Sequence, residues 1–216
     1  DVSHDYSHVL PSINLSFAID EEQTLRFGAA KTISRALLND MNASINASYG
    51  QQPDDNGNFW SISGGNPKLE PKEATGFDIS YENYFNAEGY FSAAVFYKDI
   101  NQWIFDGTYA VDMSGVANPA TGEIPATSSG TGNGKVNGGG GDLWGYELSL
   151  ALPFNVFHSS LDGFGLIASH TGIEQDVEDQ NGNEYELVGL SDQIDSLTVY
   201  YERNGFQART SMRKRS

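Results

Sequence analysis

The feature that most constrains the fold of this chain is a two-residue alternation of apolar side chains that recurs along most of its length. In residues 142–154 apolar side chains occupy every second position, and small or polar residues stand between them. A period of two places successive side chains on opposite faces of a β-strand. Only Leu37 to Ser48 has a pattern that fits a short helix. The alternation predicts eight strands, at about 9–19, 23–34, 75–85, 89–105, 142–154, 163–174, 193–202 and 205–215.

The connections between these strands alternate between short and long. The short ones lie at 20–22, 86–88, 155–162 and 202–204, and the long ones at about 35–74, 106–141 and 175–192. A β-sandwich with Greek-key connections has no reason to place every long loop at one end. An up-and-down membrane barrel does, because it has short periplasmic turns, long extracellular loops and strands of about 9–11 residues. The sequence therefore predicts an all-β, antiparallel up-and-down transmembrane β-barrel segment, with 106–141 as a low-complexity loop that packs no core.

Aromatic side chains supply an independent indication. Ten of them lie within a few residues of the short connections: Phe17, Phe85, Tyr90, Phe91, Phe154, Phe157, Phe164, Tyr200, Tyr201 and Phe206. If the short turns share one end of the sheet, these rings form a belt at one membrane interface. The alternative is that the rings merely favour strand ends and cores. The asymmetry of the loops favours the belt.

The composition fits a barrel and excludes several other classes. The chain of 216 residues has no cysteine, which excludes a disulfide scaffold and a cysteine zinc site. Its net charge of −17 is opposite to what a nucleic-acid binder needs. The longest unbroken apolar run, Ala93 to Tyr97, is far shorter than the ~20 residues of a transmembrane helix, and the first residues lack a signal-peptide pattern. Hydrophobic residues make up 38%, which is enough for a barrel wall because only every second strand residue has to be apolar.

Motifs for catalysis and for metal binding are absent or incomplete, so we expect neither an enzyme nor a bound cofactor or metal. The segment 130–135 resembles a phosphate-binding loop, but Ser129 replaces its first glycine and Val136 its final Ser or Thr. The histidines lack a metalloprotease spacing. The segments 54–58 and 179–183 begin like calcium loops but lack the acidic residue that closes such a loop, and we interpret both as polar turns.

Several stretches, taken in order, resemble one known family. They are LPSINLSFAID followed by TLRFGAAKTISR at 24–35, GGNPKLEPKEATGFDISYENYF at 64–85, FSAAVFYKDINQWI at 91–104, GYELSL at 145–150, LDGFGLIASHT at 161–171 and LTVYYERNGFQARTSMRKRS at 197–216. Together they resemble the C-terminal-half barrel segment of a TonB-dependent outer-membrane receptor of the proteobacterial type. The resemblance covers nearly the whole chain outside the long loops.

The resemblance implies that residues 1–216 form part of a larger barrel in the bacterial outer membrane. Members of the family have barrels of about 22 strands around a folded plug, and eight strands are about a third of that. No plug domain or TonB box is recognised here, and the chain ends at Lys214-Arg215-Ser216 rather than at an aromatic residue, so we expect a piece of a longer protein. The implied partners are outer-membrane lipid, the protein's own plug, the inner-membrane TonB complex and a small-molecule ligand.

The family's Gly-Asn-Pro-x-Leu-x-Pro loop corresponds here to Gly64, Gly65, Asn66, Pro67, Leu69 and Pro71. Proline fixes its own φ and pushes the residue before it towards extended geometry. The two glycines permit a sharp entry into the loop. We therefore expect a rigid, structural lead into strand 75–85 rather than a ligand contact.

The candidate ligand contacts are aromatic residues of the long loops and strand ends: Phe59, Trp60, Trp103 and Tyr109. Such rings stack on sugars or planar chelates, or pack the loops against one another. Arg26, Arg209 and Arg213 are expected on the lumen side, where they either meet the plug or an anionic ligand or remain solvated or internally paired. The long loops, with the last one counted from Glu174, hold 15 acidic and 4 basic residues, so most of the negative charge is expected outside the cell.

Three functions of different classes remain open from the sequence. The first is part of a TonB-dependent active transporter, with an oligosaccharide slightly favoured over a ferric siderophore or another chelate because aromatic residues outnumber basic ones in the long loops. The second is a self-contained eight-stranded outer-membrane barrel that acts as an anchor or adhesin. The third is a soluble secreted β-sandwich that binds carbohydrate.

Overall fold

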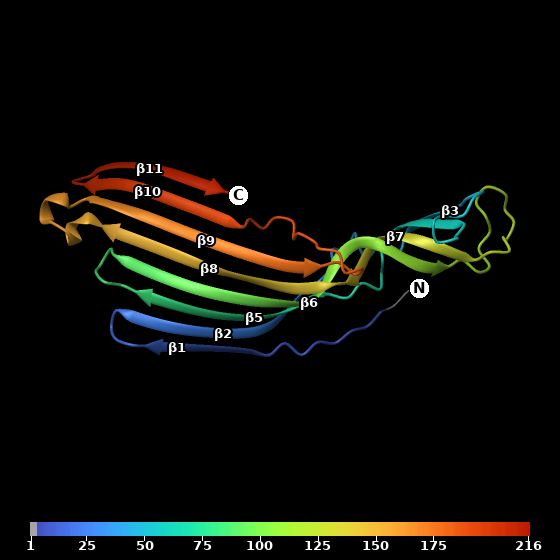
Figure 1. Cartoon of the computed structure of the whole chain (residues 1–216), viewed down its shortest axis with the longest axis horizontal. Coiled ribbons are helices and arrows are strands. Elements are labelled where there is room, and N and C mark those ends of the chain that lie inside the picture. Colours follow the sequence, from blue (N-terminus) through green and yellow to red (C-terminus); the bar gives the residue numbers. More distant parts are fainter. Residues whose placement is uncertain (1–3) are drawn as a thin grey trace.

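A computed structural model describes residues 4–216 as a nearly all-β chain (Figure 1). Eight long strands lie side by side, and each is antiparallel to its neighbours in the order β1-β2-β5-β6-β8-β9-β10-β11. They are β1 (Ser12–Ala18), β2 (Gln23–Ser34), β5 (Lys72–Asn83), β6 (Tyr90–Asp112), β8 (Gly140–Pro153), β9 (Phe164–Glu178), β10 (Gln193–Arg203) and β11 (Phe206–Arg215). All eight predicted strands are confirmed, with boundaries shifted by a few residues. Among the residues described, no helix is both long enough and apolar enough to cross a membrane.

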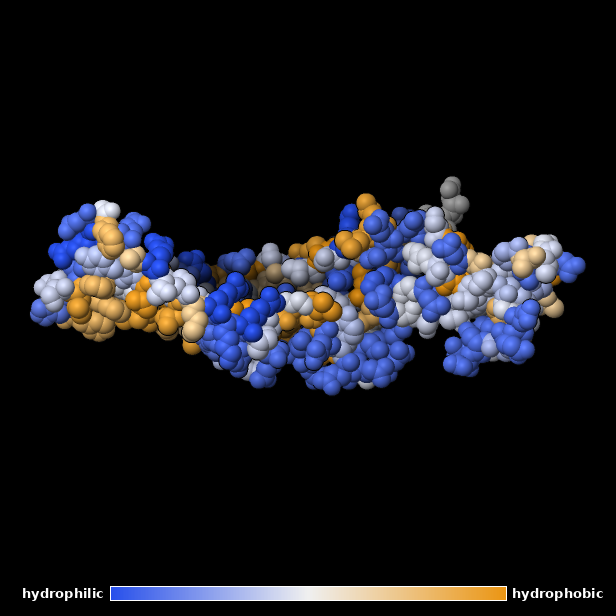
Figure 2. All heavy atoms as spheres, turned by 90° about the horizontal axis from the view of Figure 1, so that it is seen from above, coloured by the Kyte–Doolittle hydropathy of each residue, from blue (hydrophilic) through white to orange (hydrophobic). Residues whose placement is uncertain are grey.

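The register of these strands separates an apolar face from a polar face. Leu15 lies opposite Phe27, and Phe27 lies opposite Ile79, so their side chains share one face. These three residues are 46%, 36% and 43% exposed, although the side chains are large and hydrophobic. The other face carries small and polar residues, among them Ser16, Arg26, Ser80 and Glu147. Orange residues are accordingly visible on the surface along the body of the molecule in Figure 2.

The short connections all lie at the left end of the sheet in Figure 1. Between β10 and β11, Asn204 and Gly205 have φ of 53° and 79° in a two-residue turn, as a hairpin with a type I′ turn requires. Two short 3₁₀ turns, Phe154–Val156 and Ser159–Leu161, connect β8 to β9. Aromatic rings gather at this end and contact one another, with ring centroids 4.5 Å apart for Phe164 and Tyr201. The short turns and these rings therefore share one end of the sheet, and the membrane-interface belt stays a prediction.

The long connections are more ordered than the sequence indicated. The prediction that 106–141 packs no core is wrong, because β6 continues to Asp112 and pairs with β7 (Ser129–Gly138). β7 pairs in parallel with β4 (Trp60–Gly64), which pairs with β3 (Ile45–Tyr49). The helix considered for 37–48 is also wrong, since this segment forms turns and then β3. We call β3, β4, β7, the upper part of β6 from 103 to 112, and their connections the extension.

Most of the buried apolar residues form two small clusters, one at the long-loop end of the long sheet and one in the extension. The first, which we call the neck, lies where the long sheet meets the extension and contains Ile100, Phe105, Leu143, Val177 and Leu187. The second lies within the extension and contains Trp60, Ile62 and Met113. Below the neck the long sheet is a single layer, and its large apolar side chains there remain exposed.

This architecture contradicts the two alternative folds. A closed eight-stranded barrel would pair its first strand with its last, but among the residues described β1 pairs only with β2 and β11 only with β10. A sandwich would bury one face of the sheet against a second sheet. The exposed apolar residues of β1, β2 and β5 show that no second layer covers them within the described part of the chain.

A recurrent packing device places an aromatic ring flat over a glycine on the facing strand. A side chain at each of these glycines would meet the ring, because a Cβ would lie within 2.7 Å of a ring or hydroxyl atom. Glycine weakens a strand, and an aromatic neighbour that covers it restores packing. The four directly opposed pairs are Phe96 with Gly145, Tyr146 with Gly172, Tyr200 with Gly165 and Tyr109 with Gly132.

Candidate functional site

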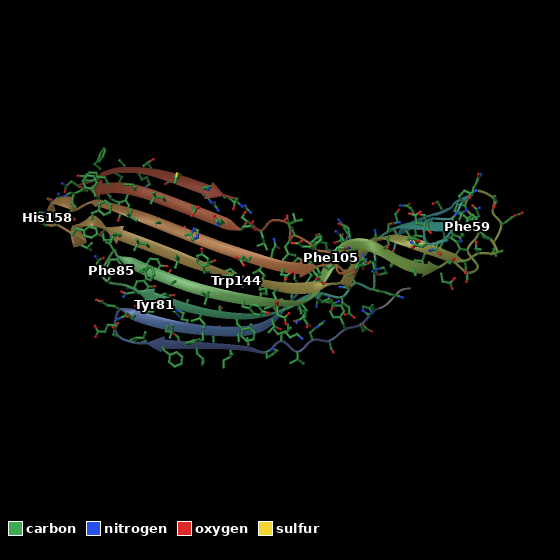
Figure 3. All side chains as sticks on the ribbon, in the orientation of Figure 1. Phe59, Tyr81, Phe85, Phe105, Trp144 and His158 are labelled. Atoms are coloured by element: carbon green, nitrogen blue, oxygen red, sulfur yellow. The ribbon has the colours of Figure 1, made fainter. Side chains whose placement is uncertain are left out.

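The extension holds the first group of predicted contact residues, at the end of the molecule opposite His158 (Figure 3). The ring of Phe59 stacks on that of Tyr49 with 5.6 Å between centroids and an angle of 17°. Trp60 meets the same Tyr49 edge-on at 5.2 Å. The indole Nε1 of Trp60 donates to the backbone oxygen of Thr127 at 3.2 Å, which ties the 113–128 connection to β4. This part of the site is therefore a packed aromatic unit.

Burial distinguishes Trp60 from the other candidates. Only 1% of Trp60 is exposed, so its ring offers no surface to a ligand in this structure. The alternation along β4 explains this position, because Trp60 and Ile62 point to the same face and form the core of the extension. We therefore interpret Trp60 as a structural residue and do not retain it as a contact.

Trp103 lies in the neck, apart from the unit formed by Phe59 and Trp60. It packs against the buried cluster there, and the ammonium of Lys72 lies 3.8 Å from its ring centroid. A cation over an indole face is a favourable interaction that fixes both groups. Tyr185 also packs against this cluster, and its ring meets that of Phe105 at 4.7 Å and 90°.

Tyr109 lies between these two groups, on β6 opposite Gly132 of β7. The glycine leaves room for the phenol ring to lie against the sheet. A ring held in this way presents one face away from the strand, and Tyr109 is only partly buried. The four predicted aromatic contacts thus occupy the neck, the middle and the far end of the extension rather than one pocket.

The Gly-Asn-Pro loop at 64–71 joins the extension to the long sheet. The side-chain amide of Asn66 donates to the backbone oxygen of Lys135 at 3.1 Å, and its carbonyl accepts from the backbone N–H of Lys68. The backbone of Glu70 makes reciprocal bonds with the side chain of Asn137, at 2.7 and 2.8 Å. Leu69 and Pro71 are buried. These contacts agree with a structural role and attach the loop to β7.

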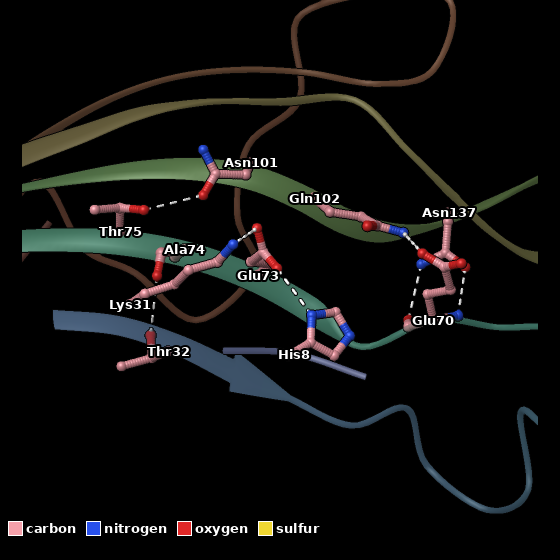
Figure 4. Close-up of polar contacts among 10 residues, drawn as sticks. All are labelled: His8, Lys31, Thr32, Glu70, Glu73, Ala74, Thr75, Asn101, Gln102 and Asn137. Atoms are coloured by element: carbon pink, nitrogen blue, oxygen red, sulfur yellow. Dashed lines mark hydrogen bonds and ion pairs between the residues drawn. The ribbon is translucent and has the colours of Figure 1, made fainter. Parts of the chain in front are cut away.

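Polar contacts around Glu70 and Glu73 continue this attachment (Figure 4). Lys31 lies 2.7 Å and His8 3.1 Å from carboxylate oxygens of Glu73. The amide of Gln102 donates to the Glu70 carboxylate at 3.3 Å. The segment before β1 and strands β2, β5 and β6 are thus linked just below the extension.

The three predicted lumen arginines all project to the polar face of the sheet. Arg26 pairs with Glu82 on β5, at 3.3 Å. Arg209 lies 3.9 Å from Glu202. Arg213 lies opposite Ser196 and makes no ion pair within residues 4–216. Internal pairing, one of the two interpretations left open by the sequence, accounts for Arg26 and Arg209.

The two segments that begin like calcium loops fold as the same polar turn. In each, the Asp side chain accepts from the backbone N–H groups two and four residues later, and a glycine with φ of 79° or 77° follows. Hydrogen bonding from Thr131, and then from Asn58, lowers the pKa of Asp54. These carboxylates satisfy their own loops, and the described residues contain no group of three or more His, Cys, Asp or Glu that could hold a metal.

Sequence reasoning missed several residues that shape the site. Asn137 and Gln102 hold the Gly-Asn-Pro loop, Thr131 bonds Asp54, and Lys135 pairs with Asp106 at 2.7 Å. The hydrogen bond from Lys135 to Asp106 raises the pKa of Lys135. The available signal was an alternation inside the glycine-rich stretch, where Thr131, Asn133, Lys135 and Asn137 occupy every second position.

Comparison with known proteins identifies the family. The sequence matches the family model for the TonB dependent receptor-like β-barrel over residues 1–214. No curated protein matches significantly. The ferric enterobactin receptor PfeA of Pseudomonas aeruginosa has a TM-score of 0.67 and 19% identity over 94% of this chain and 27% of that chain. The siderophore receptor PirA of Acinetobacter baumannii has 0.60 and 20%, over 89% and 26%. PirA of P. aeruginosa has 0.58 and 15%, over 95% and 33%.

At these identities the solved structures establish the fold, and this chain spans about a quarter to a third of each. The family consists of outer-membrane receptors rather than enzymes. The exposed apolar face of the long sheet is accordingly the surface that contacts membrane lipid, and the polar face is the lumen side. On the family match over nearly its whole length, together with the shared fold, the chain belongs to the TonB dependent receptor-like β-barrel family.

Proposed function

We propose that this chain is one part of the barrel of an active transporter that captures a scarce ligand and imports it across the outer membrane. Energy would come from the inner-membrane TonB complex, acting on a plug domain inside the complete barrel. The barrel wall itself carries no catalytic step in this proposal. Its roles are to span the membrane, to enclose the plug and to present the extension to the ligand.

The observation that carries this proposal is the pairing of one membrane-spanning wall with an ordered extension at its long-loop end. The wall alone fits any outer-membrane barrel. The extension adds aromatic and polar residues held by a packed core, the Gly-Asn-Pro loop and the neck. Rigid elements position ligand contacts better than mobile loops do.

For the ligand we propose a ferric chelate. The structural neighbours are named as siderophore and ferric enterobactin receptors, and nothing comparable favours the oligosaccharide that the aromatic content of the loops suggested. The acidic charge of the long loops opposes a strongly anionic chelate, because like charges slow encounter. A neutral or cationic chelate therefore fits this extension best.

The contact residues we propose are Phe59, Trp103 and Tyr109, which are all partly buried and partly open. Planar aromatic surfaces stack on chelates with unsaturated arms. On the lumen side, Arg213 is the first candidate to meet the plug, followed by Arg26 and Arg209, whose carboxylate partners already engage them.

The test is uptake in a strain that lacks the complete gene. Radiolabelled iron is supplied as neutral, cationic and anionic chelates, and a labelled oligosaccharide is supplied in parallel. We expect loss of uptake of one ferric chelate, and restoration by the complete gene only while the proton-motive force is intact. Unchanged uptake of every chelate, or loss of oligosaccharide uptake alone, would refute the proposed ligand class.

A further inference from the structure

A polar group interrupts the apolar, lipid-facing side of the long sheet between β8 and β11. The imidazole of His170 lies between two partners: its Nδ1 is 2.6 Å from the Asp195 carboxylate, and its Nε2 is 2.9 Å from the Tyr146 hydroxyl. Register places Lys214 on the same row, opposite Asp195. Lys214 therefore projects to the same face of the sheet as Asp195 and His170. Ionisable residues on a lipid-facing surface are rare because each is costly there.

The height of this polar group above the short turns follows from the number of strand residues between them. Lys214 lies eight residues above Phe206, the first residue of β11 after its short turn. At about 3.3 Å per residue and a tilt of about 40°, eight residues rise roughly 20 Å, which is close to the ~25 Å height of the apolar band. Lys214 therefore lies near the upper boundary of the band, and His170, six residues after Phe164, lies about 15 Å up by the same measure. That boundary faces the extension, so it corresponds to the outer leaflet.

An apolar groove of about 520 Å³ runs below this polar group. Its lipid-facing walls include Phe91, Leu148, Leu150, Ala168, Leu197 and Met212, with His170, Asp195 and Lys214 at one end. Ala168 is small and stands between Leu150 and Leu197 on the neighbouring strands, which hollows the face. The groove is part of the same face that contacts membrane lipid. A lipid acyl chain is therefore the ligand that this groove encounters in the membrane.

We propose that this groove and the polar group above it form a site for a phosphorylated lipid of the outer leaflet. One acyl chain lies against Ala168, Leu197 and Met212. The ammonium of Lys214 donates to the lipid phosphate at the band boundary, where a lysine extends naturally towards the headgroups. Asp195 and Tyr146 hold the His170 ring beside it and so complete a polar end to the groove.

The experiment uses the complete receptor in mild detergent, with bound lipid counted by native mass spectrometry during titration with diphosphoryl lipid A. Lys214→Gln is expected to weaken binding about five-fold, the loss of one charge contact near the surface, and Lys214→Arg to retain it. Ala168→Phe fills the groove and should weaken binding as well. The matched control is Lys98→Gln, because Lys98 also lies eight residues above the start of its strand but on the lumen face.

Two further arms separate the sources of binding. Lipid A without phosphates should bind more weakly than the diphosphoryl form, and inorganic phosphate should not compete at millimolar concentration. The proposal is overturned by equal binding of Lys214→Gln and Lys98→Gln, by equal binding of the phosphate-free lipid, by an unchanged Ala168→Phe variant, or by a receptor dimer that occludes the face. Gel mobility before and after heating verifies that each variant has a folded barrel.

Discussion

The long sheet and the extension use the same alternation of side chains and place it in opposite surroundings. In the long sheet the apolar members are exposed, as with Ile13 at 56% and Val95 at 52%. In the extension they are enclosed, as with Trp60 at 1% and Ile62 at 2%. The alternation of residues along a strand therefore predicts which side chains share a face of the sheet. Whether that face becomes a buried core depends on its surroundings, lipid or water. Lipid covers the first region, whereas the second has to build its own core in water.

The largest expected effect comes from removing the centre of the extension's core. Trp60→Ala should destabilise the extension by about 3–5 kcal/mol, the range for a large buried aromatic side chain, and leave the long sheet folded. Hydrogen exchange of the 106–141 segment in the complete receptor measures the change directly.

Trp144→Ala is the matched control for Trp60→Ala. Trp144 is 46% exposed on the lipid face of β8 and lies far from Phe59 along the molecule (Figure 3). Its removal should leave exchange in 106–141 unchanged. Equal loss of protection in both variants would mean that the extension has no core of its own.

The second prediction tests the lipid side of the comparison. Val95→Arg places a charge on the apolar face of β6, where it should cost about 2–4 kcal/mol near the middle of the band. Ala94→Arg places the same charge on the lumen face one residue away and should cost much less. Urea titration of the complete barrel in phospholipid vesicles gives both values. Similar costs would contradict the assignment of the two faces.

The sequence was sufficient to predict the strands of the long sheet but not those of the extension, and the difference has a physical reason. In the long sheet each strand repeats large apolar residues such as Leu148 and Leu150, so the period of two is visible. In β7 the corresponding positions are Gly130, Gly132 and Gly134, which resemble a flexible loop. Their partner residues come from other segments: Trp60 lies opposite Gly130, and the ring of Tyr109 lies over Gly132.

In the candidate site, too, features set by local sequence could be predicted, and features set by long-range strand pairing could not. The rigidity of the Gly-Asn-Pro loop followed from its prolines, but its bonding to Asn137 depends on a strand pairing that local sequence does not specify. The burial of Trp60 was equally invisible, because β4 is only five residues long and its partner β7 lies about seventy residues away along the chain. Long-range parallel pairing leaves no local signal.

The third prediction concerns the ring-over-glycine packing that both regions share. Gly132→Ala brings a Cβ to 2.5 Å from the Tyr109 ring and should destabilise the extension by about 1–3 kcal/mol. Adding Tyr109→Ala should recover part of this loss, so the double variant should be less damaged than the sum of the single ones. In the long sheet, Gly172→Ala against Tyr146 should cost less, because that ring borders fluid lipid and its displacement disturbs a single side-chain hydrogen bond, the one to His170. Differential exchange of β7 and β9 measures the two effects.

The smallest expected effect is a response to acid in two polar turns, one in the extension at Asp54 and one in the connection between β9 and β10 at Asp179, that the membrane-facing strands should not show. Hydrogen bonds from Thr131 and then Asn58 lower the pKa of Asp54, and bonds from the backbone and side chain of Asn183 lower that of Asp179. A carboxyl whose folded pKa is depressed adds stability above its unfolded pKa of about 4, and that stability is lost as the pH falls through the lower folded value. Both carboxyls are exposed, so the effect is a modest increase in proteolysis of 50–59 and 178–184 between pH 5 and pH 3, measured with an acid-active protease.

Asp54→Asn should remove the pH dependence at 50–59 and leave that at 178–184, which makes each turn the control for the other. A uniform acid response along β1, β2 and β5 as well would show that the two regions do not differ in this respect. A response limited to the two turns would show that hydrogen bonds to these carboxylates stabilise the long loops, whereas the lipid-facing strands do not depend on such bonds.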